Sequence, residues 1–304
     1  MNAPVTDSAA EASGVDADVR VGFIGLGSQG GPMARRIVES GFTLTLWARS
    51  ASTLAQYADT SAAYALTPTE LGRVSDLVCI CVTDDAGVEE VVTGEAGVLA
   101  GMAPGGAIAI HSTVHPKTCN RLAAACAEVG VDLIDAPVSG GGIAAAEKRL
   151  LVMTGGEYKV VDRFRPILET YANPIAHMGS LGAGQVTKLL NNTVFAAQLS
   201  TAAGILAIGR SLGLDPHRLA DVMANGTAGS FALKVVGPSG GDLAGMSESV
   251  GVLLRKDVGI LAEVVAAGAD ESAGHTVWAA ADDALRLLKH PRDVATSRKG
   301  VSAS

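Results

Sequence analysis

The segment VGFIGLGSQGGPMA, residues 21–34, decides the fold of this chain. Its first four residues are continuously apolar, as in a strand of a buried parallel sheet, and the helical sequence MARRIVES follows. Between them, Gly25, Gly27 and Gly30 form a GxGxxG pattern. After a strand and before a helix, such glycines allow a tight turn, close approach of a pyrophosphate and helix packing. The pattern predicts a dinucleotide site, the alternative being a turn that is merely rich in glycine.

Short apolar runs alternate with helical sequence along the next 150 residues. The runs are TLTLWAR (43–49), DLVCICV (76–82), AIAIHST (107–113), VDLIDAPV (131–138), LLVMTGG (150–156) and PIAHMG (174–179). Such alternation is typical of an α/β fold with helices on both faces of a parallel sheet. We therefore expect an N-terminal Rossmann-like domain over residues 20–182, with a doubly wound, mostly parallel sheet.

Beyond the last of these runs, the sequence consists of long helical stretches. Residues 183–212 can form one helix of about 45 Å at 1.5 Å per residue. Asp215 followed by Pro216 is a typical start for the next helix. We expect an all-helical substrate and dimerisation domain over residues 183–291, opening with this long interdomain helix.

The two ends of the chain and its composition exclude several classes of function. Residues 1–19 are expected to be a disordered tail and residues 292–304 a polar tail, and the first has no features of a signal peptide. The net charge of -8 argues against nucleic acid as a partner. The most apolar stretch, residues 193–208, is interrupted by Gln198 and falls short of the ~20 apolar residues of a membrane span. We expect a cytoplasmic protein without a membrane partner.

The cysteines and histidines show no spacing typical of a metal or redox site. We therefore expect no metal and four free thiols. The apolar stretch at 193–208 needs more cover than one small helical domain provides, so we expect a homodimer or homotetramer.

The end of the second predicted strand indicates which dinucleotide is bound. NAD sites usually carry an acidic residue there, about 20 residues after the glycines, to hold the ribose hydroxyls. This chain instead has Arg49 and Ser50, a guanidinium and a hydroxyl suited to a 2′-phosphate. The sequence therefore predicts NADP, with NAD less favoured. The alternative is that Arg49 is an ordinary exposed residue.

Two further motifs carry groups for a substrate. In DAPVSGGG at 135–142, Ser139 with Gly140 and Gly141 offers a hydroxyl and successive backbone N–H groups, which suit a small carboxylate. Lys188 and Asn192 lie four residues apart and share one face of the predicted long helix. A cation near a helix N-terminus is electrostatically disfavoured, which points to a functional role. The alternatives are a plain glycine turn and a lysine that extends to solvent.

These motifs together resemble the β-hydroxyacid dehydrogenase family. GFIGLGSQGGPMA, DAPVSGG, GAGQVTKLLNN and LLRKDVGILAE match the family in order and spacing, over about residues 21–288. The resemblance implies that Lys188 is the catalytic residue, that Asn192 beside it and the Ser139 loop hold the substrate, and that Phe231 lies near the substrate. It implies a cofactor site made of Gly25, Leu26, Gly27, Ser28, Gln29, Gly30, Arg49, Ser50, Val82, Thr83, Gly87, Thr113 and Lys256, with Asp257 the partner of Lys256.

The chain departs from the family pattern at two positions. Gln29 stands where methionine is common, and Lys148 stands where glycine is usual after the substrate loop. Asn191 occupies the position of a histidine in the decarboxylating phosphogluconate dehydrogenases, which argues against that activity. Imine reductases share the architecture but usually replace the lysine, so they are the alternative enzyme class. A non-catalytic NADP-binding module is the alternative outside enzymes.

Overall fold

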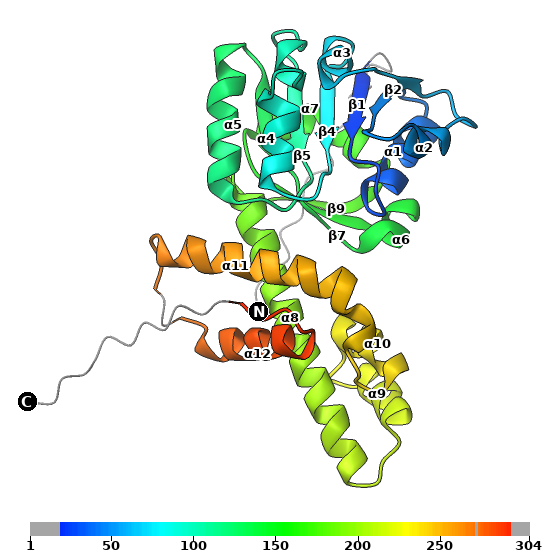
Figure 1. Cartoon of the computed structure of the whole chain (residues 1–304), viewed down its shortest axis with the longest axis vertical. Helices are drawn as coiled ribbons and strands as arrows, with labels where there is room; N and C mark the ends of the chain where they lie inside the picture. Colours follow the sequence, from blue (N-terminus) through cyan, green and yellow to red (C-terminus); the bar gives the residue numbers. More distant parts are fainter. Residues whose placement is uncertain (1–18, 271–272, 293–304) are drawn as a thin grey trace, which may run out of the picture.

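The computed structural model describes residues 19–270 and 273–292 (Figure 1). The expected tails at 1–19 and 292–304 lie outside these residues, except for Val19 and Arg292. Arg292 is held by Asp282, with its Nε 2.7 Å from Oδ1, and its guanidinium lies 5.2 Å from the centre of the Trp278 ring.

The first half of the chain forms a doubly wound α/β domain, as predicted. Its six-stranded parallel sheet has the order β3-β2-β1-β4-β5-β6. The strands are β1 (Arg20–Ile24), β2 (Thr43–Trp47), β3 (Ala63–Tyr64), β4 (Leu77–Ile80), β5 (Ala107–Ile110) and β6 (Asp132–Asp135). The strand order reverses between β1 and β4, and at such a point α/β proteins open a crevice for ligands.

Helices cover both faces of this sheet because successive side chains of each strand point to opposite faces. On β1, Phe23 packs into one core cluster with α1 and α7, and Ile24 packs into the other with α3, α4 and α5. The helices are α1 (Gly30–Glu39), α2 (Ala51–Ala55), α3 (Pro68–Arg73), α4 (Asp85–Thr93), α5 (Pro116–Glu128), α6 (Gly141–Ala146) and α7 (Tyr158–Leu168), with a 3-10 turn at Val98–Ala100.

The predicted strands at 131–138, 150–156 and 174–179 do not all join the main sheet. β7 (Val138–Ser139), β8 (Leu150–Thr154) and β9 (Ala172–His177) form a separate three-stranded sheet. The separation begins where β6 ends at Asp135, and beyond it the carbonyl oxygen of Pro137 accepts the backbone N–H of Met153 on β8 at 3.0 Å. A bridge between Asp135 and Gly155 connects the two sheets. The Ser139 loop therefore starts from a short strand of its own, beside the end of β6.

The second half of the chain is helical in its described residues and begins with the long α8. This helix spans Ala183–Ser211, one residue shorter than predicted, and runs out of the α/β domain through the helical domain (Figure 1). The remaining helices are α9 (Pro216–Ala224), α10 (Phe231–Val236), α11 (Val252–Ala266) and α12 (His275–Leu287), with short 3-10 or π turns at Gly237–Ser239, Ala244–Met246 and Ser247–Gly251. Asp215 caps α9 through the backbone N–H groups of His217 and Arg218, as its position predicted.

Helix α8 keeps an exposed apolar side despite the helices that pack on it. Val194, Ile205 and Ile208 on it are 45%, 36% and 56% exposed. By length and composition alone, α8 could cross a membrane, and only a third of its most apolar window is buried. That is a weak indication, because the core helix of a soluble protein can meet the same test.

Candidate active site

The glycine turn, Gly25–Gly30, lies where the strand order reverses. Gly25 has a φ of +97°, and a Cβ there would lie 2.2 Å from the carbonyl oxygen of Cys81. A Cβ at Gly30 would lie 2.0 Å from the carbonyl oxygen of Gly25, so neither position accommodates a side chain. At Gly27, by contrast, a Cβ would meet no atom within 4 Å. This open space next to the N-terminus of α1 fits a pyrophosphate, since the free backbone N–H groups and the helix dipole favour an anion.

Arg49 and Ser50 line a cavity of about 550 Å³ together with the glycine turn and Gly87, which we call the Arg49 cavity. Nη2 of Arg49 lies 2.6 Å from Oε2 of Glu90 on α4, and the two side chains are 70% and 66% exposed. Arg49 therefore stands at the predicted place, with a carboxylate that the sequence reasoning missed. Arg49 and Glu90 are 41 residues apart, and no local pattern connects them.

A second cavity, of about 310 Å³, lies between the α/β domain and the helical domain, and we call it the central cavity. It brings together predicted residues from five segments. They are Gly27, Ser28, Gln29, Gly30, Val82, Thr83, Thr113, Lys188, Asn192 and Lys256. Nζ of Lys256 on α11 lies 3.3 Å from the carbonyl oxygen of Thr83 and also donates to that of Thr113. Lys256 thus connects the helical domain to the ends of β4 and β5.

A third cavity, of about 820 Å³, opens on the other side of Lys188 and is named the Phe231 cleft. One wall is the predicted substrate loop, Ser139, Gly140 and Gly141, and another carries Phe231, which is 65% exposed. Most of the remaining lining is apolar. It comprises Leu190, Val194, Phe195, Val235, Met246, Val250, Leu253 and Leu254, with Thr187, Lys188, Asn191, Asn192 and Gln198.

The substrate loop is packed directly on the glycine turn. A Cβ at Gly142 would lie 2.2 Å from the carbonyl oxygen of Ser28, so the two loops leave no room between them. Gly140 and Gly141 have φ values of +128° and +75°, which glycine adopts readily. A Cβ at Gly141 would meet no atom within 4 Å, so this part of the loop is open to a ligand.

Lys188 lines both the central cavity and the Phe231 cleft, and so stands between them. Burial lowers the pKa of its ammonium from 10.5 to about 8. The carboxylate of Asp257 raises this pKa, and the charge of Lys256 lowers it further. An amine with such a pKa exchanges its proton near neutral pH, which is what a general acid or base requires.

Asn192 points its amide nitrogen at Asp257 on α11. Nδ2 donates to Oδ2 at 2.6 Å, while Oδ1 of Asn192 accepts from Asn191 at 3.0 Å. Oδ1 of Asp257 lies 3.2 Å from Nζ of Lys256, which agrees with the pairing that the resemblance implied. The sequence predicted Asp257 as the partner of Lys256 alone. This buried carboxylate also binds Asn192 and raises the pKa of Lys188.

The start of α8 is fixed by two buried side chains that the sequence reasoning did not single out. Asp135, at the end of β6, accepts the backbone N–H groups of Gly182 and Gln185, each at 2.7 Å. Gln185 in turn accepts from Val114 N at 3.1 Å and donates to Ser112 O at 2.8 Å. Asp135 belongs to the DAPVSGGG motif, where its carboxylate before Pro137 was the available signal. These bonds set the position of Lys188, one turn further along the helix.

His111 lines the central cavity, but both nitrogens of its ring contact buried groups of the core. Its Nδ1 lies 2.7 Å from the carbonyl oxygen of Ala136, and its Nε2 lies 3.1 Å from the hydroxyl of Tyr171. Burial lowers the pKa of its imidazole to about 4, so it stays neutral. Among the described residues, no group of three or more His, Cys, Asp or Glu could hold a metal ion.

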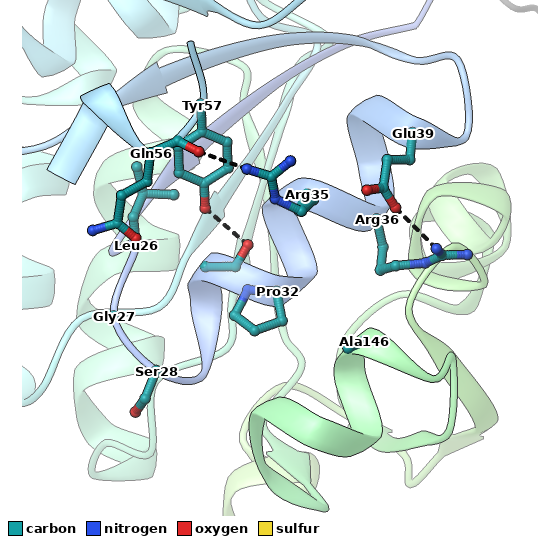
Figure 2. A pocket seen from close by; sticks show the side chains of 11 residues that line it. Leu26, Gly27, Ser28, Pro32, Arg35, Arg36, Glu39, Gln56, Tyr57 and Ala146 are labelled. Carbon is teal, nitrogen blue, oxygen red and sulfur yellow. Dashed lines mark hydrogen bonds and ion pairs between the residues drawn. The ribbon is translucent and has the colours of Figure 1, made fainter. Parts of the chain in front are cut away.

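A further cavity, of about 700 Å³, lies beside α1 (Figure 2). Arg36 in it pairs with Glu39 at 2.9 Å, one turn along the same helix. The hydroxyl of Tyr57 donates to the carbonyl oxygen of Gly31 at 2.8 Å, in the first turn of α1. The Tyr57 bond ties α1 to the segment that follows α2.

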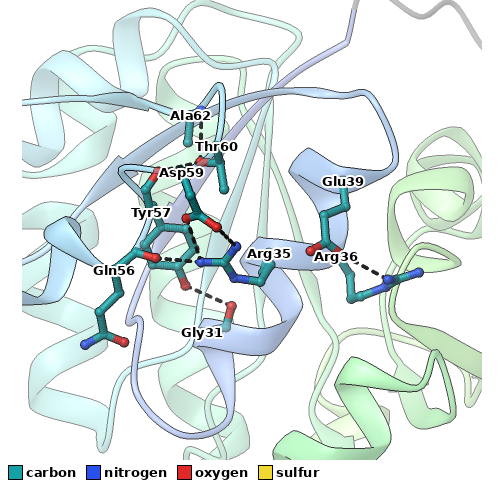
Figure 3. A network of polar contacts seen from close by, with 9 residues as sticks. All are labelled: Gly31, Arg35, Arg36, Glu39, Gln56, Tyr57, Asp59, Thr60 and Ala62. Atoms are coloured by element: carbon teal, nitrogen blue, oxygen red, sulfur yellow. Dashed lines mark hydrogen bonds and ion pairs between the residues drawn. The ribbon is translucent and has the colours of Figure 1, made fainter.

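Arg35 completes this connection (Figure 3). Its guanidinium pairs with Asp59 at 2.9 Å and donates to the carbonyl oxygen of Gln56. Both arginines of the cavity thus have carboxylate partners. The network stabilises the position of α1, the helix that follows the glycine turn. It adds no cation free for a ligand in this part of the described chain.

The two departures from the family pattern have different surroundings. Lys148 is exposed and has a φ of +57°, a conformation that glycine adopts with less strain, which gives a physical reason for glycine being usual there. Gln29 lines the central cavity, with its Nε2 3.8 Å from the sulfur of Met33. Lys148 thus affects the loop backbone, and Gln29 faces the site itself.

Comparison with known proteins agrees with this geometry. Residues 20–179 match the model of the NAD-binding domain of 6-phosphogluconate dehydrogenase, and residues 182–295 match that of the NAD-binding region of NADP-dependent 3-hydroxyisobutyrate dehydrogenase. The NAD-dependent L-serine dehydrogenase of Pseudomonas aeruginosa is 31% identical over 260 residues, which cover 83% of this chain and 87% of that enzyme.

Two solved structures are similar along most of the chain. The 3-hydroxyisobutyrate dehydrogenase of Mycobacterium tuberculosis with L-serine has a TM-score of 0.76 and 28% identity, covering 91% of this chain and 96% of that one. Psf3 in complex with NADP+ and 2-OPP has a TM-score of 0.74 and 26% identity, covering 86% and 91%. The resemblance predicted from the motifs is therefore confirmed, and the protein is an NAD(P)-dependent oxidoreductase that belongs to the β-hydroxyacid dehydrogenase family.

Proposed function

We propose that this enzyme is NADP-dependent and interconverts a small β-hydroxyacid and its semialdehyde, such as a 3-hydroxyisobutyrate-like, tartronate-like or succinate-like compound, with Lys188 as general acid and base. The observation that carries the proposal is the position of Lys188, which lines both the central cavity and the Phe231 cleft. The bound nicotinamide supplies or accepts the hydride. The oxygen of the reacting carbon must gain or lose a proton in the same reaction, and Lys188 is the titratable group at the boundary between the two cavities.

The chain's own residues divide the remaining work. The ammonium of Lys188 donates its proton to the substrate oxygen during reduction, and the free amine takes a proton from the hydroxyl during oxidation. Ser139, Gly140 and Gly141 hold the carboxylate of the substrate through a hydroxyl and backbone N–H groups. Asp257 keeps Asn192 in place and opposes the effect of burial on the pKa of Lys188. Phe231 closes the apolar side of the cleft.

The preference for NADP rests on Arg49 and Ser50 in the Arg49 cavity. A guanidinium binds a phosphate through paired N–H groups, and the hydroxyl of Ser50 adds a further donor. Steady-state kinetics with both cofactors tests this part of the proposal. We expect kcat/KM to be higher with NADPH, and a clear preference for NADH would contradict it.

An imine reductase of the same architecture is the second candidate function. The apolar lining of the Phe231 cleft favours it, because such a wall suits a substrate with a hydrocarbon ring. Lys188 argues against it, since imine reductases usually replace that lysine. A panel of semialdehydes, glyoxylate and cyclic imines, each followed by NADPH oxidation, separates the two functions. Tight NADPH binding without turnover of any compound would instead favour a non-catalytic NADP-binding module.

We also propose that the enzyme works in the cytoplasm as a homodimer or homotetramer. The exposed apolar side of α8, with Val194, Ile205 and Ile208, supports assembly, because a second copy would remove these side chains from water. The net charge of -8 supports the absence of a nucleic-acid partner. The packing of α10, α11 and α12 on α8 supports the absence of a membrane partner, because these helices cover part of its apolar surface. Light scattering of the purified protein gives the mass of the assembly, and a monomer at micromolar concentration would contradict the proposal.

A further inference from the structure

The Arg49 cavity carries a charge arrangement that recognition of a 2′-phosphate does not explain. Three charged side chains line it: Arg49, Asp84 and Glu90. The carboxylate of Asp84 caps α4 by accepting the backbone N–H of Gly87 at 2.8 Å, so its role is structural. Arg49 and Glu90 remain, and they form an ion pair in the cavity lining, with Nη2 2.6 Å from Oε2.

A 2′-phosphate would have to compete with Glu90 for Arg49. The phosphate carries a charge of about -1.5 to -2, and a carboxylate within a few ångströms of it is repulsive. The neutral 2′-hydroxyl of NAD imposes no such cost and leaves the ion pair intact. The carboxylate of Glu90 therefore partly cancels the attraction of Arg49 for the 2′-phosphate of NADP.

We propose that Glu90 is a specificity-determining residue that weakens the preference of this enzyme for NADP over NAD. The inference rests on the proposed role of Arg49 in binding the 2′-phosphate. It predicts an enzyme that uses both cofactors, with a discrimination smaller than Arg49 alone would give. Arg49 and Glu90 come from segments 41 residues apart, so the balance depends on how β2 and α4 are placed by the fold.

Binding of adenosine fragments tests the proposal without turnover. The probes are 2′,5′-ADP and 5′-AMP, which differ by the 2′-phosphate, and the signal is the fluorescence of Trp47, which lines the same cavity. In Glu90→Gln we expect 2′,5′-ADP to bind about 5- to 10-fold more tightly, with 5′-AMP within about twofold of the unmodified enzyme. Because both groups are exposed, the gain should shrink at high salt.

Glu89→Gln is the matched control. Glu89 is the neighbouring residue on α4 but pairs with Arg121 and does not line the Arg49 cavity. Its substitution removes the same charge from the same helix, and we expect both affinities to stay within about twofold. A gain in Glu89→Gln equal to that in Glu90→Gln would mean that overall charge, and not the ion pair, sets the affinity, and would overturn the proposal.

Arg49→Gln and the double variant separate the failure of this inference from the failure of the NADP assignment. If Arg49→Gln weakens 2′,5′-ADP but Glu90→Gln does not strengthen it, the role of Glu90 is wrong and the NADP assignment stands. If neither variant changes the affinity for 2′,5′-ADP, both are wrong. The proposal also expects the effect of Glu90→Gln to be smaller in the Arg49→Gln background, since the two side chains are in contact.

Discussion

The cofactor side of the active site is the glycine turn, where a Cβ at Gly25 or Gly30 would lie within 2.2 Å of a carbonyl oxygen. On the substrate side, the Phe231 cleft is lined by side chains from α8, α10 and α11 and leaves about 820 Å³ free. The first region is defined by backbone geometry and the second by side chains that helices bring together. A dinucleotide common to many enzymes can be held by a fixed backbone, whereas a particular substrate has to be selected by side chains. Lys188, at the boundary, belongs to both regions.

Removing Lys188 should have the largest effect on catalysis. Lys188→Met deletes the proton donor while filling a similar volume, so we expect kcat to fall by about 10²- to 10⁴-fold. The affinity for NADPH, measured by its fluorescence, should stay within about threefold because the glycine turn is unchanged. Equal losses of kcat and NADPH affinity would mean that Lys188 belongs to the cofactor side alone.

The contrast within the glycine turn tests the cofactor side. In Gly25→Ala the new Cβ meets the carbonyl oxygen of Cys81 at a φ of +97°, so we expect about 3 kcal/mol less stability to urea and loss of NADPH binding. In Gly27→Ala the Cβ meets no atom within 4 Å, so stability should change by less than about 0.5 kcal/mol. NADPH binding should still weaken there. Equal stability of the two variants would contradict the backbone account of this region.

The anchor of α8 tests whether the two regions are positioned together. Asp135→Asn replaces a buried carboxylate that accepts two backbone N–H groups, and we expect a loss of about 1 to 3 kcal/mol in unfolding free energy. Because Lys188 lies one turn further on, kcat should fall more than NADPH affinity does. Asp132→Asn, an exposed change on the same strand, is the control and should leave both unchanged. Unaltered kcat in a destabilised Asp135→Asn enzyme would limit Asp135 to a structural role.

The smallest effect is expected beyond the substrate loop. Lys148 has a φ of +57°, and Lys148→Gly relieves that strain at the cost of a more flexible unfolded chain. We expect a net gain of about 0.5 to 1 kcal/mol in urea unfolding. Lys289, at a φ of +63° after α12, offers a matched substitution far from the loop. If only Lys148→Gly changes KM for the substrate, Lys148 acts on the cleft, and if neither variant gains stability, the strain argument is wrong.

The parts of the molecule that follow from local sequence could be predicted. The turn between β1 and α1 depends on three glycines within six residues, Gly25 to Gly30, and α8 begins at Ala183 as its sequence indicated. The residues proposed for cofactor and substrate line the Arg49 cavity, the central cavity and the Phe231 cleft. The turn and the start of α8 are each encoded within one segment, and the set of site residues was implied by the family resemblance.

The parts that depend on contacts between distant segments could not be predicted. Glu90 meets Arg49 across 41 residues, and Asp257 meets Asn192 across 65. The second sheet, which begins after β6 ends at Asp135, was likewise not expected, because its apolar runs look like those of the main sheet. The packing of whole helices and strands determines which charged side chains pair and which sheet a strand joins. Local sequence patterns do not specify this packing.

The pH dependence of turnover in both directions tests the role of Lys188 most directly. Its pKa is lowered to about 8, so the protonated donor is lost above that pH and the free base is lost below it. At limiting substrate, kcat/KM for reduction should fall about tenfold per pH unit above 8, and kcat/KM for oxidation should rise about tenfold per unit up to 8 and then level off, because kcat/KM reports ionisation in the free enzyme. Rates that stay flat between about pH 6.5 and 9.5 in both directions would contradict proton transfer by Lys188.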